Sequence, residues 1–215
     1  MKTVHCIGDS HASIFNGKDG TISQAGNFPF SEDCLPNFRT YNIGGGLAYN
    51  VGNPDHRWNI VVNKIINDCV NKDDYILLSF GQVDTAVHIL KQSQIQDRPI
   101  EELSIECAIK YFEFAKTLIG RCYKIILYGP VTAGNMVVTD YPFGDKLIAA
   151  KFFTNKLVEL SKNNYNVLSL PLYNKIIDAQ NTTRVRAELF FDQTHLSKTF
   201  LPTVFEELRE MGIMS

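Results

Sequence analysis

Two short polar segments at opposite ends of the chain carry the residue types needed to cleave an ester. Ser10 follows a brief apolar run at residues 3–7, and Asp192 lies three positions before His195. A serine hydroxyl is a weak nucleophile unless an imidazole removes its proton, and the imidazole needs an acceptor that fixes its tautomer. The spacing of Asp192 and His195 allows the carboxylate to reach the ring nitrogen that faces away from Ser10. We therefore expect Ser10, His195 and Asp192 to act as nucleophile, base and orienting acid.

The turn that would carry Ser10 reads Gly8-Asp9-Ser10-His11. A β-branched run followed by glycine and a short acidic and hydroxyl pair predicts a strand, a tight turn and the start of a helix. Such a turn places the serine at the carboxyl end of a strand, where open α/β sheets hold their ligands. The alternative is that Asp9 and Ser10 only cap the helix, as these residue types often do.

The elements that must position these groups alternate along the chain. We expect strands at 3–7, 39–43, 75–80, 124–128 and 167–170, because these short apolar runs end at glycine or polar turns. Amphipathic helices are expected after Asn53-Pro54 up to Cys69, over 101–119, over 147–160 and before Gly212. Residues 16–37 and 131–143 are expected to be loops. This alternation predicts a parallel sheet with helices on both faces.

Length, composition and charge limit the number of domains, the partners and the compartment that we expect. The chain has 215 residues, 45% of them hydrophobic, and a formal net charge of -2. We expect a single domain over 1–215 that needs no cofactor or metal, since the five histidines show no ligand-like pairing. The charge gives no reason to expect nucleic acid or an anionic membrane as partner. Five scattered cysteines and the lack of a signal-like or membrane-length segment favour a cytoplasmic protein with free thiols.

By the order of its motifs, nearly the whole chain resembles the SGNH/GDSL hydrolases. In that family a Gly-Asp-Ser near the N-terminus supplies the nucleophile, a second-block glycine and the asparagine of a G-x-N-D block bind the oxyanion, and a C-terminal D-x-x-H completes the triad. The resemblance implies a three-layer α/β/α sandwich with a five-stranded parallel, flavodoxin-like sheet. It also implies that Ser10, a glycine such as Gly45 or Gly46 and a third-block residue stabilise the oxyanion.

The chain departs from the family pattern at two places. His11 stands where leucine is common, and Val83 stands where G-x-N-D has asparagine. Because valine has no donor, Gln82 or His88 is expected to replace the asparagine, or the backbone N–H groups act alone. The run 79–88 is similar to a variant block, G-E-I-D-x-R-x-H, of members near polysaccharide metabolism. The candidate substrate-binding residues are accordingly Asp9, His11, Asp84 and His88.

The expected function is hydrolysis of small acyl esters, with O-acetyl groups on carbohydrate as the favoured substrate. Asn16, Asn27, Asn37, Phe28 and Phe30 in the 16–37 loop could stack on and hydrogen-bond a sugar. Two alternatives stay open: a weakly active or inactive glycan-binding protein, and an O-acyltransferase with the same triad. An α/β-hydrolase is disfavoured because that fold needs several strands before its nucleophile, whereas a single strand precedes Ser10.

Overall fold

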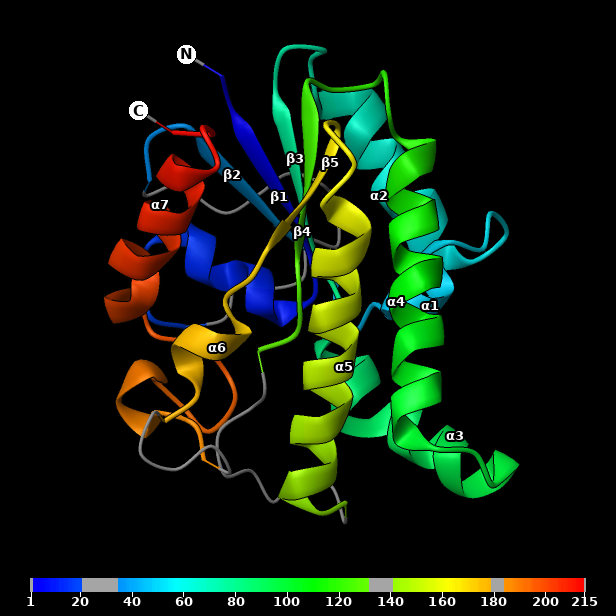
Figure 1. Ribbon diagram of the computed structural model, residues 1–215. Coiled ribbons are helices and arrows are strands. Elements are labelled where there is room, and N and C mark those ends of the chain that lie inside the picture. The colour runs from blue at the N-terminus through cyan, green and yellow to red at the C-terminus, as the bar shows by residue number, and fades with distance from the viewer. Residues whose placement is uncertain (1, 21–34, 132–140, 179–183, 215) are drawn as a thin grey trace.

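The sheet is parallel throughout and has five strands. A computed structural model of the chain describes residues 2–20, 35–131, 141–178 and 184–214. The strands are β1 (Val4–Gly8), β2 (Phe38–Asn42), β3 (Tyr75–Ser79), β4 (Lys124–Tyr128) and β5 (Val167–Leu170). Their order in the sheet is β2-β1-β3-β4-β5 (Figure 1). This is the flavodoxin-like order, with its switch point beside β1, so the expected fold class is confirmed.

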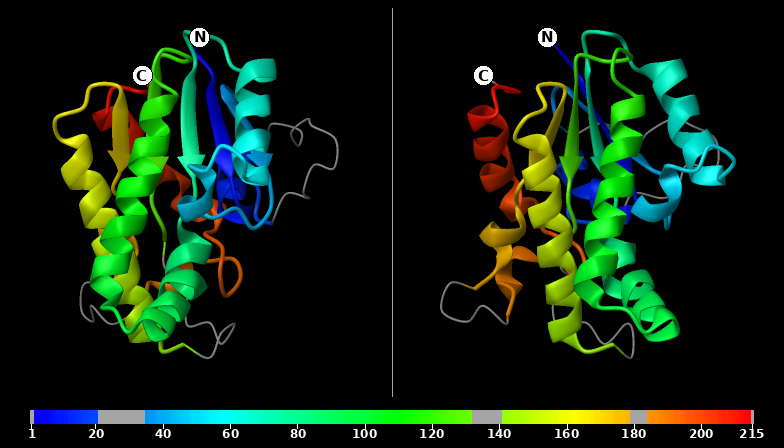
Figure 2. Two further views of the ribbon diagram at one scale, coloured as in Figure 1. Left: turned by 90° about the vertical axis from the view of Figure 1, so that its right-hand side faces the viewer. Right: turned by 45° about the vertical axis from the view of Figure 1, so that its right-hand side comes forward.

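Helices cover both faces of the sheet, as Figure 2 shows. The α-helices are α1 (Ala48–Val51), α2 (Arg57–Cys69), α3 (Ile89–Gln96), α4 (Ile100–Thr117), α5 (Phe143–Ser161), α6 (Tyr173–Ile176) and α7 (Leu201–Glu210). Short 3-10 or π turns span η1 (Ser10–Asn16), η2 (Asp84–His88), η3 (Ala187–Leu189) and η4 (Lys198–Phe200). Side chains of α2, α4 and α5 form one apolar core with the sheet, and those of η1, α6 and α7 form the other.

Alternation along the strands divides these two cores. In β3, Ile76 and Leu78 belong to the core under α2 and α4, whereas Leu77 belongs to the core under η1 and α7. Successive residues of a strand point to opposite faces, so a strand covered on both sides must be apolar at every position. This requirement explains why the uninterrupted apolar runs were correctly expected to be strands.

Some expected helix boundaries are wrong. Helix α2 begins at Arg57, with His56 as its N-cap, and not at Asn53-Pro54. Helix α5 begins at Phe143, the last residue of the expected 131–143 loop, where Pro142 precedes its first turn. The helical stretch formed by η2 and α3 is not among the expected helices.

Candidate active site

Ser10 is the first residue of η1, directly beyond the carboxyl end of β1. Asp9 is the N-cap, and its carboxylate accepts the backbone N–H of His11 at 2.9 Å. Gly8 allows β1 to approach β3 closely, since a Cβ at this position would lie 2.1 Å from the carbonyl oxygen of Ser79. The strand end and the cap therefore fix the place of the serine.

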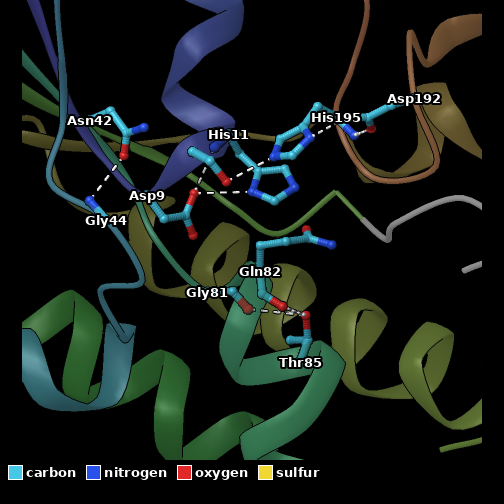
Figure 3. A network of polar contacts seen from close by, with 10 residues as sticks. Asp9, His11, Asn42, Gly44, Gly81, Gln82, Thr85, Asp192 and His195 are labelled. Carbon is cyan, nitrogen blue, oxygen red and sulfur yellow. Dashed lines mark hydrogen bonds and ion pairs between the residues drawn. The ribbon is translucent and has the colours of Figure 1, made fainter. Parts of the chain in front are cut away.

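The C-terminal motif meets Ser10 across 185 positions of sequence. His195 Nε2 lies 2.8 Å from Ser10 Oγ, and His195 Nδ1 lies 2.8 Å from Asp192 Oδ2 (Figure 3). The other carboxylate oxygen, Asp192 Oδ1, accepts the backbone N–H groups of Thr194 and His195, each at 2.6 Å. With Nδ1–H donating to Asp192, Nε2 is left as the acceptor for the Ser10 hydroxyl. The three expected catalytic residues thus form one chain of hydrogen bonds.

The charges around this chain suit a neutral base beside an ionised acid. Partial burial would raise the pKa of Asp192, but the N–H groups of His195 and Thr194 and the His195 ring together hold that pKa below its ordinary value. Burial lowers the pKa of His195, and His11 lowers it further, whereas Asp192 and Asp9 act to raise it. An unprotonated His195 can accept the Ser10 proton as the hydroxyl attacks.

A further aspartate, Asp19, connects the two motif segments. Asp19 Oδ1 accepts the Ser197 hydroxyl at 2.9 Å and the Lys198 backbone N–H at 2.7 Å. These bonds connect the segment after η1 to the segment after His195. Sequence reasoning missed Asp19, because nothing local distinguishes it from any other loop aspartate.

The glycine segment after β2 is oriented by Asn42, which was also missed. Asn42 Oδ1 accepts the N–H of Gly44 at 2.9 Å, and Gly44 adopts a φ of 87° that favours glycine. The N–H of Gly46 donates to the Gly44 carbonyl at 2.7 Å. The N–H of Gly46 is thus engaged within the segment, whereas exposed Gly45 makes no N–H hydrogen bond to a described residue. Both glycines stay predicted oxyanion donors.

The side chain of Gln82 lies close to Asp9 and His11 but is buried. It is 5% exposed and lines a small cavity together with Asp9, His11 and Tyr128. Its Oε1 has no hydrogen-bond partner among the described residues. Val83, at the position of the family asparagine, precedes η2 and offers no side-chain donor. Gln82 as an oxyanion donor therefore stays a prediction.

Three of the four candidate substrate-binding residues are buried. Asp9 is 1% exposed, Asp84 0% and His11 7%. Asp84 accepts the backbone N–H groups of Ala48 and Tyr49 at 2.8 and 3.2 Å, so it caps α1. These side chains make internal contacts, and their expected role in substrate binding stays a prediction.

His88 ends η2 and lines a different cleft of about 370 Å³ between α1, α3 and α4, in which neither Ser10 nor His195 takes part. It therefore has no place in the Ser10 network. Of the expected sugar-binding loop, residues 21–34, including Asn27, Phe28 and Phe30, lie outside the described residues. Asn16 belongs to η1 and is buried.

Solved structures with a similar fold are consistent with the topology of this sheet. A lipase from a goat rumen metagenome superimposes with a TM-score of 0.56 at 13% identity over 100% of this chain and 99% of its own. A protein described as an SGNH hydrolase from Slackia heliotrinireducens gives 0.54 at 11% identity over 97% of both chains. The fold is that of the SGNH/GDSL hydrolases. A protein described as an acylhydrolase from Bacteroides fragilis superimposes with a TM-score of 0.54 at 14% identity over 99% of this chain and 86% of its own.

Sequence comparisons add nothing to this structural likeness. No family model matches the chain, and no curated protein matches it. Within the described ranges, no helix is long and apolar enough to cross a membrane. The same ranges contain no group of three or more His, Cys, Asp or Glu side chains placed to hold a metal ion.

Proposed function

We propose that this protein is a serine ester hydrolase that acts on small acyl esters. The observation that carries the proposal is the pair of 2.8 Å contacts that join Ser10, His195 and Asp192. If Ser10 only capped η1, its hydroxyl would have no reason to contact the imidazole of His195. Asp192 also orients that imidazole through the opposite ring nitrogen, as a catalytic base requires.

The chemistry follows from these contacts. Ser10 Oγ attacks the ester carbonyl carbon while its proton passes to His195 Nε2, and Asp192 stabilises the imidazolium through Nδ1–H. The carbonyl oxygen becomes an oxyanion, for which the N–H groups of Ser10 and Gly45 are the proposed donors. The alcohol leaves with the proton of His195. Water then attacks the acyl-serine and gives a proton to His195. His195 returns this proton to Ser10 Oγ as the bond between Oγ and the acyl carbon breaks, which releases the carboxylic acid and restores the enzyme.

Hydrolysis of p-nitrophenyl acetate by wild type and by Ser10→Ala tests the proposal. We expect kcat to fall by about 10³-fold or more without the nucleophile. Equal rates in the two proteins would refute the assignment. A fluorophosphonate probe should label Ser10 in the wild type, because only an activated serine reacts rapidly, and His195→Ala should abolish the labelling. Labelling that survives this change would contradict the role of His195.

We also propose that the acyl group is carried on a carbohydrate. Asn27, Phe28 and Phe30 in the 16–37 stretch support this substrate class, since such side chains bind sugars by hydrogen bonding and stacking. A kinetic comparison of acetyl-xylose with p-nitrophenyl palmitate tests it. Clear preference for the palmitate ester would overturn the carbohydrate assignment and leave the triad intact.

A further inference from the structure

A cleft that is separate from the Ser10 network lies between α1, α3 and α4, and α3 itself lies beyond the carboxyl ends of the strands (Figure 1). The volume of the cleft is about 370 Å³, within the range of about 300–1,000 Å³ that is usual for small-molecule sites. Leu47 lines the cleft and comes two residues after Gly45, a proposed oxyanion donor. Asp84 lines it too, with both carboxylate oxygens bonded to N–H groups of α1. The cleft therefore lies next to the segment that would hold the reacting carbonyl.

The backbone along one wall of this cleft is unusual. The segment η2 is a π-helical turn, in which the N–H of Ile89 donates to the carbonyl of Asp84, five residues back. Such turns are rare and occur frequently at functional sites. Asp84, His88 and Ile89 all line the cleft, whereas the catalytic triad uses no residue of η2. The π-helical turn therefore indicates a function of the cleft itself.

Planar polar side chains form a connected row along the wall made by α3 and α4. Gln96 Nε2 donates to Gln92 Oε1 at 2.7 Å. Arg98 Nη1 donates to Gln96 at 3.4 Å and to Glu106 at 3.2 Å. Among the described residues, the amide N–H₂ of Gln92 and the side chain of Asn50 in α1 have no hydrogen-bond partner, and both residues line the cleft. The cleft thus offers amide groups that are held in place and free to bind a ligand.

The charged side chains of this wall are already paired. Arg98 forms ion pairs with Glu106 at 3.2 Å and with Glu102 at 3.7 Å, and Glu106 also pairs with Lys110 at 3.3 Å. Burial lowers the pKa of His88, which favours its neutral form. Recognition of a phosphate or carboxylate usually uses an Arg or Lys that is free to pair with it. The lining therefore suits a neutral polar ligand better than an anion.

We propose that this cleft binds the neutral sugar that carries the acyl group, and that Asn50 and Gln92 hold its hydroxyl groups. The inference rests on the proposed ester hydrolysis and gives its substrate a place in the structure. Sugar hydroxyl groups both donate and accept hydrogen bonds, as side-chain amides do. The C–H groups of a sugar ring pack on apolar side chains, which Leu47, Ile89 and Leu103 supply in this cleft.

Binding is tested by NMR titration of the wild type with xylobiose, cellobiose and chitobiose, which are neutral and carry no ester. We expect at least one of them to give saturable shifts of the backbone amides of residues 47–50 and 89–96. These shifts should weaken in Asn50→Ala/Gln92→Ala. Failure of all three sugars to bind, or shifts confined to other residues, would overturn the inference. Tighter binding of inorganic phosphate in the cleft would also overturn it.

The kinetic test compares acetyl-xylose with p-nitrophenyl acetate, which has the same acyl group but no sugar. In Asn50→Ala/Gln92→Ala we expect the ratio of kcat/KM for acetyl-xylose to kcat/KM for p-nitrophenyl acetate to fall about tenfold, because hydrogen bonds from two side chains are lost. The matched control is Gln94→Ala, since Gln94 is an exposed glutamine of the same helix and does not line the cleft. Its ratio should equal that of the wild type.

An unchanged ratio in the double variant, or an equal loss in Gln94→Ala, would contradict the proposed role of the cleft. Thermal unfolding identifies which variants are folded, and Gln92→Ala alone carries the test if the double variant is not. A wild type that hydrolyses no ester would refute the proposed function, while the titration with unesterified sugars still decides whether the cleft binds them.

Discussion

Replacing Gly8 by alanine should separate β1 from β3 at the point from which Ser10 is presented. A Cβ at this position would lie 2.1 Å from the carbonyl oxygen of Ser79 and 2.6 Å from its Cβ. The contact is with backbone on the paired strand, so no side-chain rotation relieves it. The same displacement would break the bond from Asp9 N–H to the Ser79 carbonyl, 3.1 Å.

These losses set the expected magnitude. Overpacking in a close-packed interior costs about 1–3 kcal/mol, and the lost hydrogen bond adds about 1 kcal/mol. We expect the free energy of unfolding of Gly8→Ala to fall by about 2–4 kcal/mol, measured by urea denaturation. The matched control is Gly45→Ala, whose Cβ would meet nothing within 4 Å, and we expect it to change stability by less than about 0.5 kcal/mol. A Gly8→Ala protein within 1 kcal/mol of wild type would refute the reasoning, as would equal losses in the two variants.

Three further predictions concern the site and its support. Asp192→Asn should lower kcat by about 10³–10⁴-fold in ester hydrolysis assays, since the amide N–H₂ favours the His195 tautomer that cannot accept the Ser10 proton; a loss below tenfold would argue against this role. Val83→Asn should raise kcat by about 10²-fold by restoring an oxyanion donor, and an unchanged rate would refute that explanation. Burial raises the pKa of Asp84 to about 6 from 3.8, so the folded state binds its proton more tightly than the unfolded state. The resulting stability is present below pH 4 and is lost as the pH rises through 6, by up to about 3 kcal/mol; urea denaturation across this range should show the slope in wild type, and the same slope in Asp84→Asn would contradict it.

The strands were predictable and the start of α2 was not, for a physical reason. A strand buried on both faces must be apolar at consecutive positions, and that pattern is local. A helix start depends on which short polar side chain takes the free N–H groups. Asn53 accepts the N–H of Asp55 in an Asx turn, while His56 accepts the N–H of Trp58 and starts α2. Both are ordinary uses of such residues, and the local sequence does not choose between them.

The helical stretch of η2 and α3 escaped prediction because little of it is buried. In α3 the buried residues are Ile89 and Leu90, and the remaining positions are mostly polar, so no apolar stripe with a helical period develops. Its place is set by tertiary contacts. Asp84, at the start of η2, caps α1 through the N–H groups of Ala48 and Tyr49, a contact across more than thirty residues that spacing alone does not reveal.

The two interpretations of the Gly-Asp-Ser-His turn prove to describe different residues. Asp9 does cap η1, as short acidic residues commonly do, and it also holds the His11 ring. Ser10 follows that cap, and its hydroxyl is bonded to His195. The local sequence is compatible with either role at either position. The roles of Asp9 as cap and Ser10 as nucleophile are decided by the position of the Asp192–His195 loop. Asp19 connects this loop to the segment after η1 through hydrogen bonds with Ser197 and Lys198. The chemistry of the site therefore depends on a contact between the two ends of the chain, and a change that loosens that loop should impair Ser10 without disturbing its cap.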